Sequence, residues 1–135
     1  MTPEDCQIWV LMCELPDPFE WWPWIPEDEP LTREEVHTAI EAGRFEAEQY
    51  PGPTYGLRGT DWTREQHVQR VAHFVVHGWP DTILVEADAG GGLSFDGHHR
   101  IAAARYLGHT VMHATGCGFV RHLERLHREA KEETP

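Results

Sequence analysis

The sequence predicts an α+β domain in which a small mixed sheet is flanked by helices. The first observation behind this prediction is a set of apolar runs of strand length, at residues 7–15, 82–86 and 110–115. Two helix starts are marked by capping boxes, in which Thr32 is followed by Glu35 and Thr63 by Gln66. Because strands and helices do not alternate strictly along the chain, the pattern favours the α+β class over the α/β class.

The first part of the chain predicts one strand and an irregular aromatic segment. Residues 7–15 read as a strand, which Pro16 and Pro18 end. Prolines also exclude a regular helix over residues 19–26, Phe-Glu-Trp-Trp-Pro-Trp-Ile-Pro. We predict that residues 17–30 form an extended strap with the tryptophan rings inward, which covers one side of the cleft at residues 96–100. Its carboxylates should face outward: Asp17, Glu20, Glu27, Asp28 and Glu29. The alternative is a lid or a protein-binding patch, because exposed aromatic clusters mark contacts.

The remaining elements follow from periodicity and from helix stop signals. One helix should cover residues 32–42 and end at Gly43, and a second should cover residues 63–77 and end at Gly78. Further strands are expected at 82–86, 93–95 and 110–115, and further helices at 99–107 and 119–132. The 135 residues suit a single domain, 1–135, with an acidic, Trp- and Pro-rich part at 1–60, a core at 61–115 and a C-terminal helix in 116–135.

The charge of the chain is strongly and unevenly acidic. The formal net charge is −12, and residues 1–48 contain 13 of the 23 acidic residues but two of the 11 basic ones. Binding to DNA phosphates needs clustered Lys and Arg, so we expect no direct binding to duplex DNA. No apolar run approaches the roughly 20 residues that span a bilayer, and the first five residues are acidic where a secretory signal is basic. We therefore expect a cytoplasmic protein without membrane contact.

The densest chemical signal is the run from Ser94 to Ala104, Ser-Phe-Asp-Gly-His-His-Arg-Ile-Ala-Ala-Ala. A strand ends here, Gly97 turns the chain, and a helix begins. The first N–H groups of a helix lack intrahelical acceptors and lie at the positive end of its dipole, which favours a phosphate. Gly97 allows a ligand close to the backbone, and Arg100 offers a planar fork of donors. These residues predict an anion site; the alternative is a plain turn with Arg100 in solvent.

This segment resembles the ParB/sulfiredoxin superfamily. The signature of that superfamily is a Gly-x-(His/Arg)-Arg turn that opens an alanine-rich helix ending in Leu-Gly. The chain reads Gly-His-His-Arg over residues 97–100, followed by Ala-Ala-Ala-Arg-Tyr-Leu-Gly over residues 102–108. The resemblance covers residues 61–115. It implies a ParB/sulfiredoxin fold with a phosphate-binding turn in which Gly97, His99 and Arg100 hold phosphate oxygens.

The members of the superfamily differ in their chemistry, and the chain differs from several of them. Sulfiredoxin has a catalytic cysteine after the glycine, where this chain has His98, so sulfiredoxin chemistry is not expected. ParB proteins continue into DNA-binding and dimerisation domains, for which the chain has no room. Free-serine kinases have an Asp-Gly-His-x-Arg turn, which matches residues 96–100 and makes His98 a further candidate contact. ParB-like nucleases would need an acidic metal cluster, which the sequence does not indicate.

The resemblance and the residue types together suggest catalytic roles. The cofactor is expected to be a nucleotide (ATP, ADP or CTP) with Mg²⁺, which Asp96 would bind directly or through water. Asp96, His98 and Glu20 are the candidate catalytic residues. An acidic residue near the first strand acts as base in the serine kinases, and Asp17 or Glu20 are the candidates here. For the histidines at positions 98 and 99, the alternative to an acid–base role is a structural one, in which one of them caps the helix.

Other residues carry weaker signals. His73 and His77 have an i, i+4 spacing that suits zinc, but ten histidines produce this spacing by chance, and we interpret the pair as surface or half-buried. The three cysteines are odd in number and contain no CxxC, which favours reduced thiols.

Two classes of function are open at this stage. The first is a protein that binds a nucleotide or another phosphorylated small molecule, with phosphoryl transfer or nucleotide hydrolysis as its activity if it is an enzyme. The second is a non-catalytic interaction protein that offers its acidic first third, with Trp21, Trp22 and Trp24, to a protein partner.

Overall fold

In the computed structural model, residues 6–22, 29–50 and 62–133 are described. The elements, in chain order, are β1 (Gln7–Leu11), the 3-10 helix η2 (Met12–Glu14), α1 (Arg33–Ala42), α2 (Arg64–His77), β2 (Ile83–Ala87), β3 (Leu93–Asp96), α3 (His98–Tyr106), β4 (Val111–Gly118) and α4 (Val120–Glu133). The strands form one mixed sheet in the order β1-β4-β2-β3. The predicted class, a small mixed sheet with helices around it, is confirmed.

The sheet combines two antiparallel pairs around one parallel pair. Strand β1 is antiparallel to β4, β4 is parallel to β2, and β2 is antiparallel to β3. Asp88 closes the β2–β3 turn, because its side-chain oxygen accepts hydrogen bonds from the amides of Gly90 and Gly92 at 2.9 and 2.8 Å. The parallel pairing of β4 with β2 requires a crossover, and the connection contains β3 and α3.

Two strand boundaries differ by more than one residue from those predicted. The first strand ends at Leu11 instead of Leu15, because its partner β4 begins opposite Leu11. One more backbone hydrogen bond follows, from the amide of Met12 to the carbonyl of Thr110 at 2.9 Å. The chain then turns through η2, where the amide of Leu15 donates to the carbonyl of Met12 at 3.1 Å. Strand β4 runs three residues beyond the predicted end at Thr115, because its second half pairs with β2 as far as Gly118.

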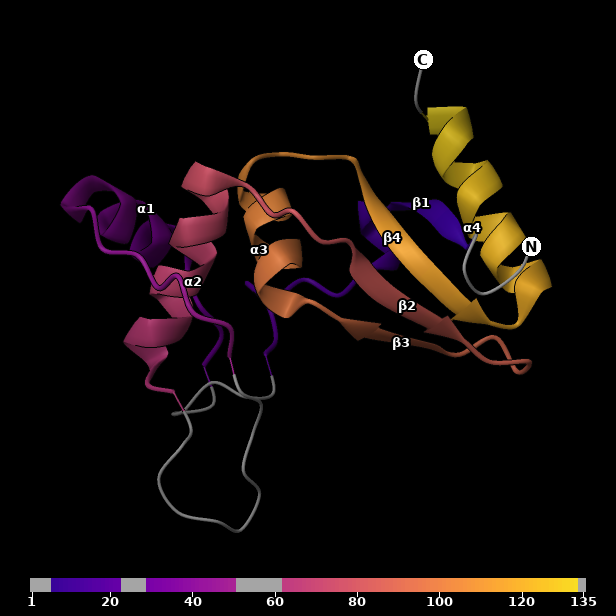
Figure 1. The fold of residues 1–135 in the computed structure, drawn as a ribbon, viewed down its shortest axis with the longest axis horizontal. Coiled ribbons are helices and arrows are strands. Elements are labelled where there is room, and N and C mark those ends of the chain that lie inside the picture. The colour runs from indigo at the N-terminus through magenta and orange to yellow at the C-terminus, as the bar shows by residue number, and fades with distance from the viewer. Residues whose placement is uncertain (1–5, 23–28, 51–61, 134–135) are drawn as a thin grey trace, which may run out of the picture.

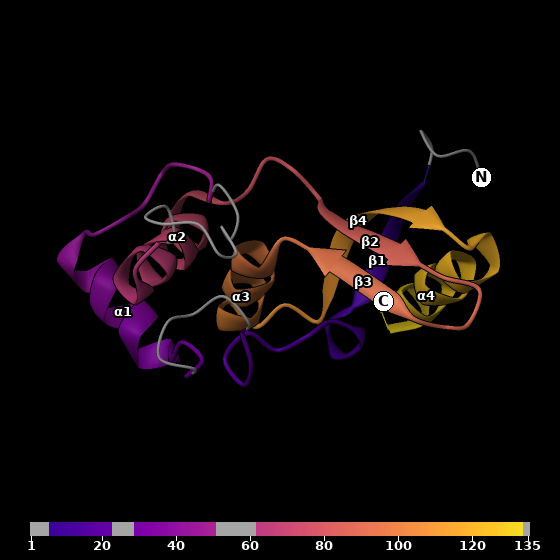
Figure 2. The same cartoon turned by 90° about the horizontal axis from the view of Figure 1, so that it is seen from below.

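The molecule has a helical half and a sheet half, with α3 between them (Figures 1 and 2). In the sheet half, the inward side chains of the strands pack on α4, with Ile8, Val85 and Leu123 among those buried. In the helical half, α1 and α2 pack together through residues such as Val36 and Val71. Each half therefore has its own apolar cluster.

Helix α3 belongs to both clusters. Ile101 and Ala104 pack in the sheet half, whereas Ala102 and Ala103 pack in the helical half. All four side chains are fully buried, which is expected for a helix contacted on opposite sides. The alanines keep the helix thin, so α2 can approach it closely. This central position places the first turn of α3 where the two halves meet.

The predicted helix signals are confirmed in the helical half. Both capping boxes form: the Thr32 side chain accepts from the Glu35 amide, and the Thr63 side chain accepts from the Gln66 amide. Gly43 ends α1 in the left-handed region, with φ of 67°. Across the described residues, every helix is too short or too polar to span a membrane.

Candidate functional site

The turn between β3 and α3 has the tight geometry that the sequence predicts. Strand β3 ends at Asp96, Gly97 adopts the left-handed conformation with φ of 115° and ψ of 37°, and α3 begins at His98. A Cβ atom at position 97 would lie 2.8 Å from Cγ2 of Ile83 and 3.0 Å from a guanidinium nitrogen of Arg100. Glycine is therefore required at this position both by its backbone angles and by its neighbours.

The first turn of α3 offers backbone donors to a ligand. The first helical hydrogen bond runs from the amide of Ile101 to the carbonyl of Gly97 at 2.9 Å. The amides of His99 and Arg100 precede this bond, so the helix itself supplies them with no acceptor. Gly97 has no side chain to cap them. The positive end of the helix dipole adds to the attraction for an anion.

The turn lines a cavity of about 380 Å³. The described residues around it come from the chain before α2, from α2, from the α2–β2 connection and from the turn: Gln49, Tyr50, Arg70, Phe74, Trp79, Pro80, Asp81, Asp96, Gly97, His98, His99 and Arg100. The lining includes every residue of the turn that was predicted to bind phosphate. A cavity of this size accepts a small ligand or part of a larger one.

Arg100 does not extend into solvent. Its Nη1 atom donates to the carbonyl of Thr82 at 2.6 Å and to that of Asp81 at 3.3 Å. Both carbonyls belong to the chain entering β2, so the guanidinium is fixed beside Gly97 on the cavity wall. A guanidinium held in this way loses little side-chain entropy when it binds an oxyanion.

Arg70 is a second cationic residue of the cavity, and sequence analysis did not identify it. Its Nη1 atom donates to the carbonyls of Ala47 and Glu46 at 2.8 and 3.3 Å. Its guanidinium lies over the ring of Phe74, 4.2 Å from the centroid. Partial burial lowers the pKa of Arg70 and the charge of Arg100 adds to this effect, while Glu46 opposes it. No local motif distinguishes Arg70 from the other polar residues of α2.

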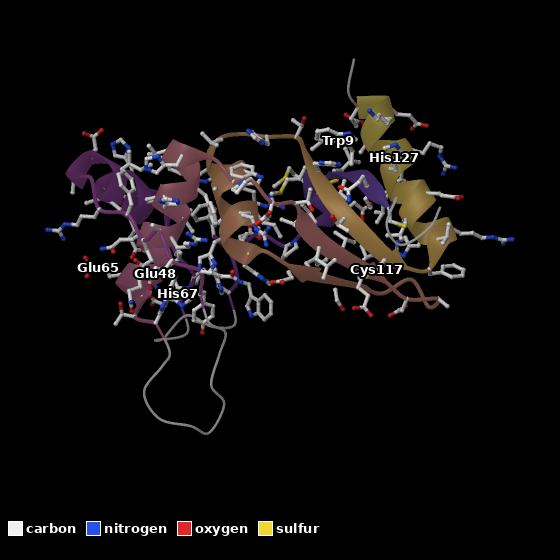
Figure 3. All side chains as sticks on the ribbon, viewed as in Figure 1. Trp9, Glu48, Glu65, His67, Cys117 and His127 are labelled. Atoms are coloured by element: carbon white, nitrogen blue, oxygen red, sulfur yellow. The ribbon has the colours of Figure 1, made fainter. Side chains whose placement is uncertain are left out.

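The ring of His99 contacts the ring of another histidine. Its Nε2 atom lies 2.9 Å from Nδ1 of His67 on α2, and the planes of the two rings are nearly parallel, with an interplanar angle of 8°. His67 is labelled in Figure 3. Both side chains are buried, and the rings of Trp22, Tyr50 and Trp62 surround the pair. The prediction that His99 holds phosphate oxygens therefore rests on its backbone amide, because its Nε2 already has a partner.

Burial keeps both histidines of the turn neutral near pH 7. Burial, followed by the charges of His67, Arg70, His98 and Arg100, lowers the pKa of His99 well below its usual 6.5. Burial also lowers the pKa of His98, and Asp96 partly opposes this shift. A neutral imidazole can accept a proton, so His98, which lines the cavity, keeps its candidacy as a general base.

The cavity also has an acidic side, formed by Asp81 and Asp96. Within the described residues, no group of three or more His, Cys, Asp or Glu side chains could hold a metal ion. A divalent cation at Asp96 would therefore need most of its ligands from a bound phosphate and from water, which is the usual arrangement for Mg²⁺ with nucleotides.

Glu20 does not reach this site. It is exposed, and it is not among the described residues that line the cavity. Asp17, the other candidate base, accepts from the amide of Phe19 at 2.9 Å and lies 3.9 Å from Nη1 of Arg105. The sequence suggested Glu20 as a base on the condition that the strap borders the cleft. In the structure Glu20 lies in a turn, where the amides of Glu20 and Trp21 both donate to the carbonyl of Asp17 at 3.0 Å.

In its described part, the aromatic strap borders the turn through Trp22. Trp22 is buried, and its ring centroid lies 4.8 Å from that of His99 and 5.9 Å from that of His98. Trp21 is 63% exposed, so the expectation of inward rings is wrong for this residue. Trp24 and the acidic residues Glu27 and Asp28 lie outside the described residues.

The His73–His77 pair and the three cysteines, which carried weaker signals in the sequence, are not among the described residues that line the cavity. The rings of His73 and His77 lie 4.8 Å apart at a tilted angle, and burial lowers the pKa of His73, with His77 and Arg70 adding to the shift. All three cysteines are free thiols, as expected. Trp9 and His127, both labelled in Figure 3, belong to the sheet half, where the Trp9 amide donates to Nδ1 of His127 at 3.0 Å.

Comparisons of the chain with protein-family models, with curated proteins and with solved structures find no match. The functional interpretation of this site therefore depends on its geometry and on the resemblance of its turn.

Proposed function

We propose that the chain binds a nucleotide or another phosphorylated small molecule in the cavity at the start of α3. One observation carries this proposal: two guanidinium groups from different helices and the first-turn amides of α3 line the same cavity. The Gly-His-His-Arg turn, which resembles the ParB/sulfiredoxin signature, supports the same assignment and the same fold family.

Electrostatics favour an anion between the two arginines. The charge of Arg100 contributes to the lowered pKa of Arg70, which means that the two cations repel each other. A phosphate placed between them replaces this repulsion with two charge-assisted contacts. Each guanidinium is also fixed by backbone carbonyls, so binding does not have to order a flexible side chain.

The acidic side of the cavity defines how the phosphate would be oriented. Asp81 and Asp96 repel phosphate oxygens, so the anion lies toward the arginines and the turn. A Mg²⁺ ion shared between Asp96 and the phosphate would remove the repulsion on the other side. If the ligand reacts, His98 and Asp96 are the groups that lie close enough to serve phosphoryl transfer or hydrolysis; Glu20 has no part in this proposal.

One observation favours the second candidate function, binding of a protein partner. Trp21 exposes 63% of its surface beside the acidic Glu20, and large exposed aromatic side chains are typical of contact surfaces. This function would leave the arginine cavity unused, and the two candidates are therefore separable by ligand binding.

A thermal-shift screen tests the proposed function. AMP, ADP, ATP, CTP, pyrophosphate and inorganic phosphate are each added with and without Mg²⁺. A ligand present at about 100 times its dissociation constant should add roughly 2.7 kcal/mol to the free energy of unfolding. Absence of any shift, confirmed by calorimetry at millimolar ligand, would contradict phosphate binding and leave the partner-binding candidate.

A further inference from the structure

The phosphate site of the proposed function is divided between two helices. Arg70 lies on α2 and Arg100 on α3, and each is anchored to a different segment of backbone. Their separation therefore depends on how closely the two helices approach at this end. The cations repel each other, so a contact between the helices is needed to hold them at a fixed spacing when the site is empty.

One polar contact joins the two helices at this position. His67 lies three residues before Arg70 on α2, which places the two side chains on the same face of that helix. His99 immediately precedes Arg100 on α3. The 2.9 Å contact between Nδ1 of His67 and Nε2 of His99 therefore connects the backbone segments that carry the two arginines.

The buried, aromatic surroundings of the His67–His99 contact make it costly to break. His67 is fully buried, and His99 is 8% exposed. In an apolar aromatic environment a lost hydrogen bond is not replaced by water, so the contact resists separation of the helices. The hydrogen bond requires one ring nitrogen to donate and the other to accept, so the tautomers of the two rings are coupled.

We propose that His67 is a positioning residue for the phosphate site: its hydrogen bond to His99 sets the spacing between Arg70 on α2 and Arg100 on α3. His67 is not among the described residues that line the cavity, so it would act through His99 rather than on the ligand. The inference rests on the proposed function, because it concerns the geometry of the same site.

Substitutions at position 67 separate the hydrogen bond from the volume of the side chain. His67→Asn keeps a polar atom at the position of Nδ1, and the amide can donate or accept as His99 requires. His67→Leu fills much of the same space with an apolar group. His37→Leu is the control, since His37 lies on α1 with most of its side chain exposed.

The probe is whichever of inorganic phosphate, pyrophosphate and ADP the wild-type protein binds most tightly, with affinity measured by calorimetry. We expect His67→Leu to weaken binding about tenfold or more, whereas His67→Asn should stay within about threefold of the wild type. A folded His67→Leu protein with wild-type affinity would overturn the inference, and so would equal losses in the Asn and Leu variants.

Hydrogen exchange gives a readout that does not depend on the ligand. The amide of Ile101, which closes the first turn of α3, should exchange faster in His67→Leu than in His67→Asn; equal exchange in the two variants would overturn the inference.

If His67→Leu does not fold, His99→Gln and His99→Leu provide the same comparison from the other ring. A wild-type protein that binds none of the three probes contradicts the proposed function, whereas tight wild-type binding that His67→Leu leaves unchanged contradicts this inference alone.

Discussion

The two halves of the molecule have different interiors. Where α4 packs on the sheet, the buried side chains are mostly aliphatic, with Ile8, Val85 and Leu123 among them, and α4 also buries His122. Where α2 meets α3, the interior also contains the His67–His99 pair, and two arginines line the adjacent cavity. Buried polar groups cost free energy unless they are paired, so a domain gains nothing in stability from placing them there. The difference is in line with the proposed function, which places ligand binding at the α2–α3 end and leaves the sheet half to stabilise the domain.

The largest expected effect concerns the contribution of the sheet half to the stability of the domain. Leu123 is fully buried against the sheet, so Leu123→Ala should lower the free energy of unfolding by about 2–5 kcal/mol. The affinity of the folded protein for the probe ligand should not change, because Leu123 is remote from the cavity lining. Chemical denaturation and calorimetry measure the two quantities. A large loss of affinity with little loss of stability would reverse the assignment.

The second prediction concerns the site. Arg100→Ala and Arg70→Ala should each weaken binding of a phosphorylated ligand by about 1.5–3 kcal/mol, the usual value of a charge-assisted contact. Arg128→Ala on α4 is the matched control, since Arg128 is exposed and lies in the sheet half (Figure 1). Each variant also removes a backbone contact, to Thr82 for Arg100 and to Ala47 for Arg70, so both proteins must first be shown to be folded. Equal affinity in Arg70→Ala and the wild type would remove Arg70 from the site.

Local signals in the sequence predicted the elements and the turn. Capping boxes, stop glycines and the Gly97 turn each depend on residues within a few positions, and all of them form as predicted. The end of β1 was not predictable in this way, because it is decided by where β4 begins, about 100 residues later. Strand ends depend on partners that a single segment does not contain.

The site itself was predicted only on its α3 side. Residues 96–100 form a continuous motif, and all five line the cavity. His67 and Arg70 come from a helix about 30 residues earlier, and their role depends on the packing of α2 against α3. The position of Glu20 also depends on long-range contacts, because the chain just before it is held by Arg105, which donates to the carbonyl of Pro16 at 3.2 Å and lies 3.9 Å from the carboxylate of Asp17.

The third prediction is that mild acid weakens the α2–α3 end. Burial holds the pKa of His99 below 6.5 in the folded protein, whereas in the unfolded chain it should be near 6.5. Below pH 6.5 the unfolded chain therefore binds more protons than the folded protein. The free energy of unfolding should fall as the pH drops from 6.5 toward the lower pKa of folded His99, and this residue should not affect it above that range. The slope should approach about 1.4 kcal/mol per pH unit for each such histidine.

His99→Gln provides the control for this pH dependence. The remaining groups that face His99 are His67 and Arg70 on α2 and His98 and Arg100 on α3, and a bound phosphate should oppose their combined positive charge. Denaturation curves between pH 5 and pH 8 should be flatter in His99→Gln than in the wild type. Identical slopes would show that the acid sensitivity arises elsewhere, with His98 and His73 as the next groups to test.

The fourth prediction concerns the acidic side of the cavity. If Asp96 shares a Mg²⁺ ion with the bound phosphate, Asp96→Asn should weaken binding in the presence of Mg²⁺ more than in its absence. Without Mg²⁺ the same substitution should leave affinity unchanged or improve it, because it removes a negative charge near the phosphate. Glu20→Gln is the control, as Glu20 is exposed outside the cavity. An equal loss with and without Mg²⁺ would exclude a metal role for Asp96.

The smallest expected effect is a change in tryptophan fluorescence, which tests whether the strap lies close to the bound ligand. Trp22 is buried against His98 and His99, so a ligand at the turn should change its fluorescence, whereas Trp21, in solvent, should not respond. Trp79 also lines the cavity and should contribute. In single Trp→Phe variants, the ligand-induced change should shrink at positions 22 and 79 and persist at position 21. A response that disappears with Trp21→Phe would place the ligand near the exposed acidic surface, and the helical end would then work as a contact surface instead of a phosphate site.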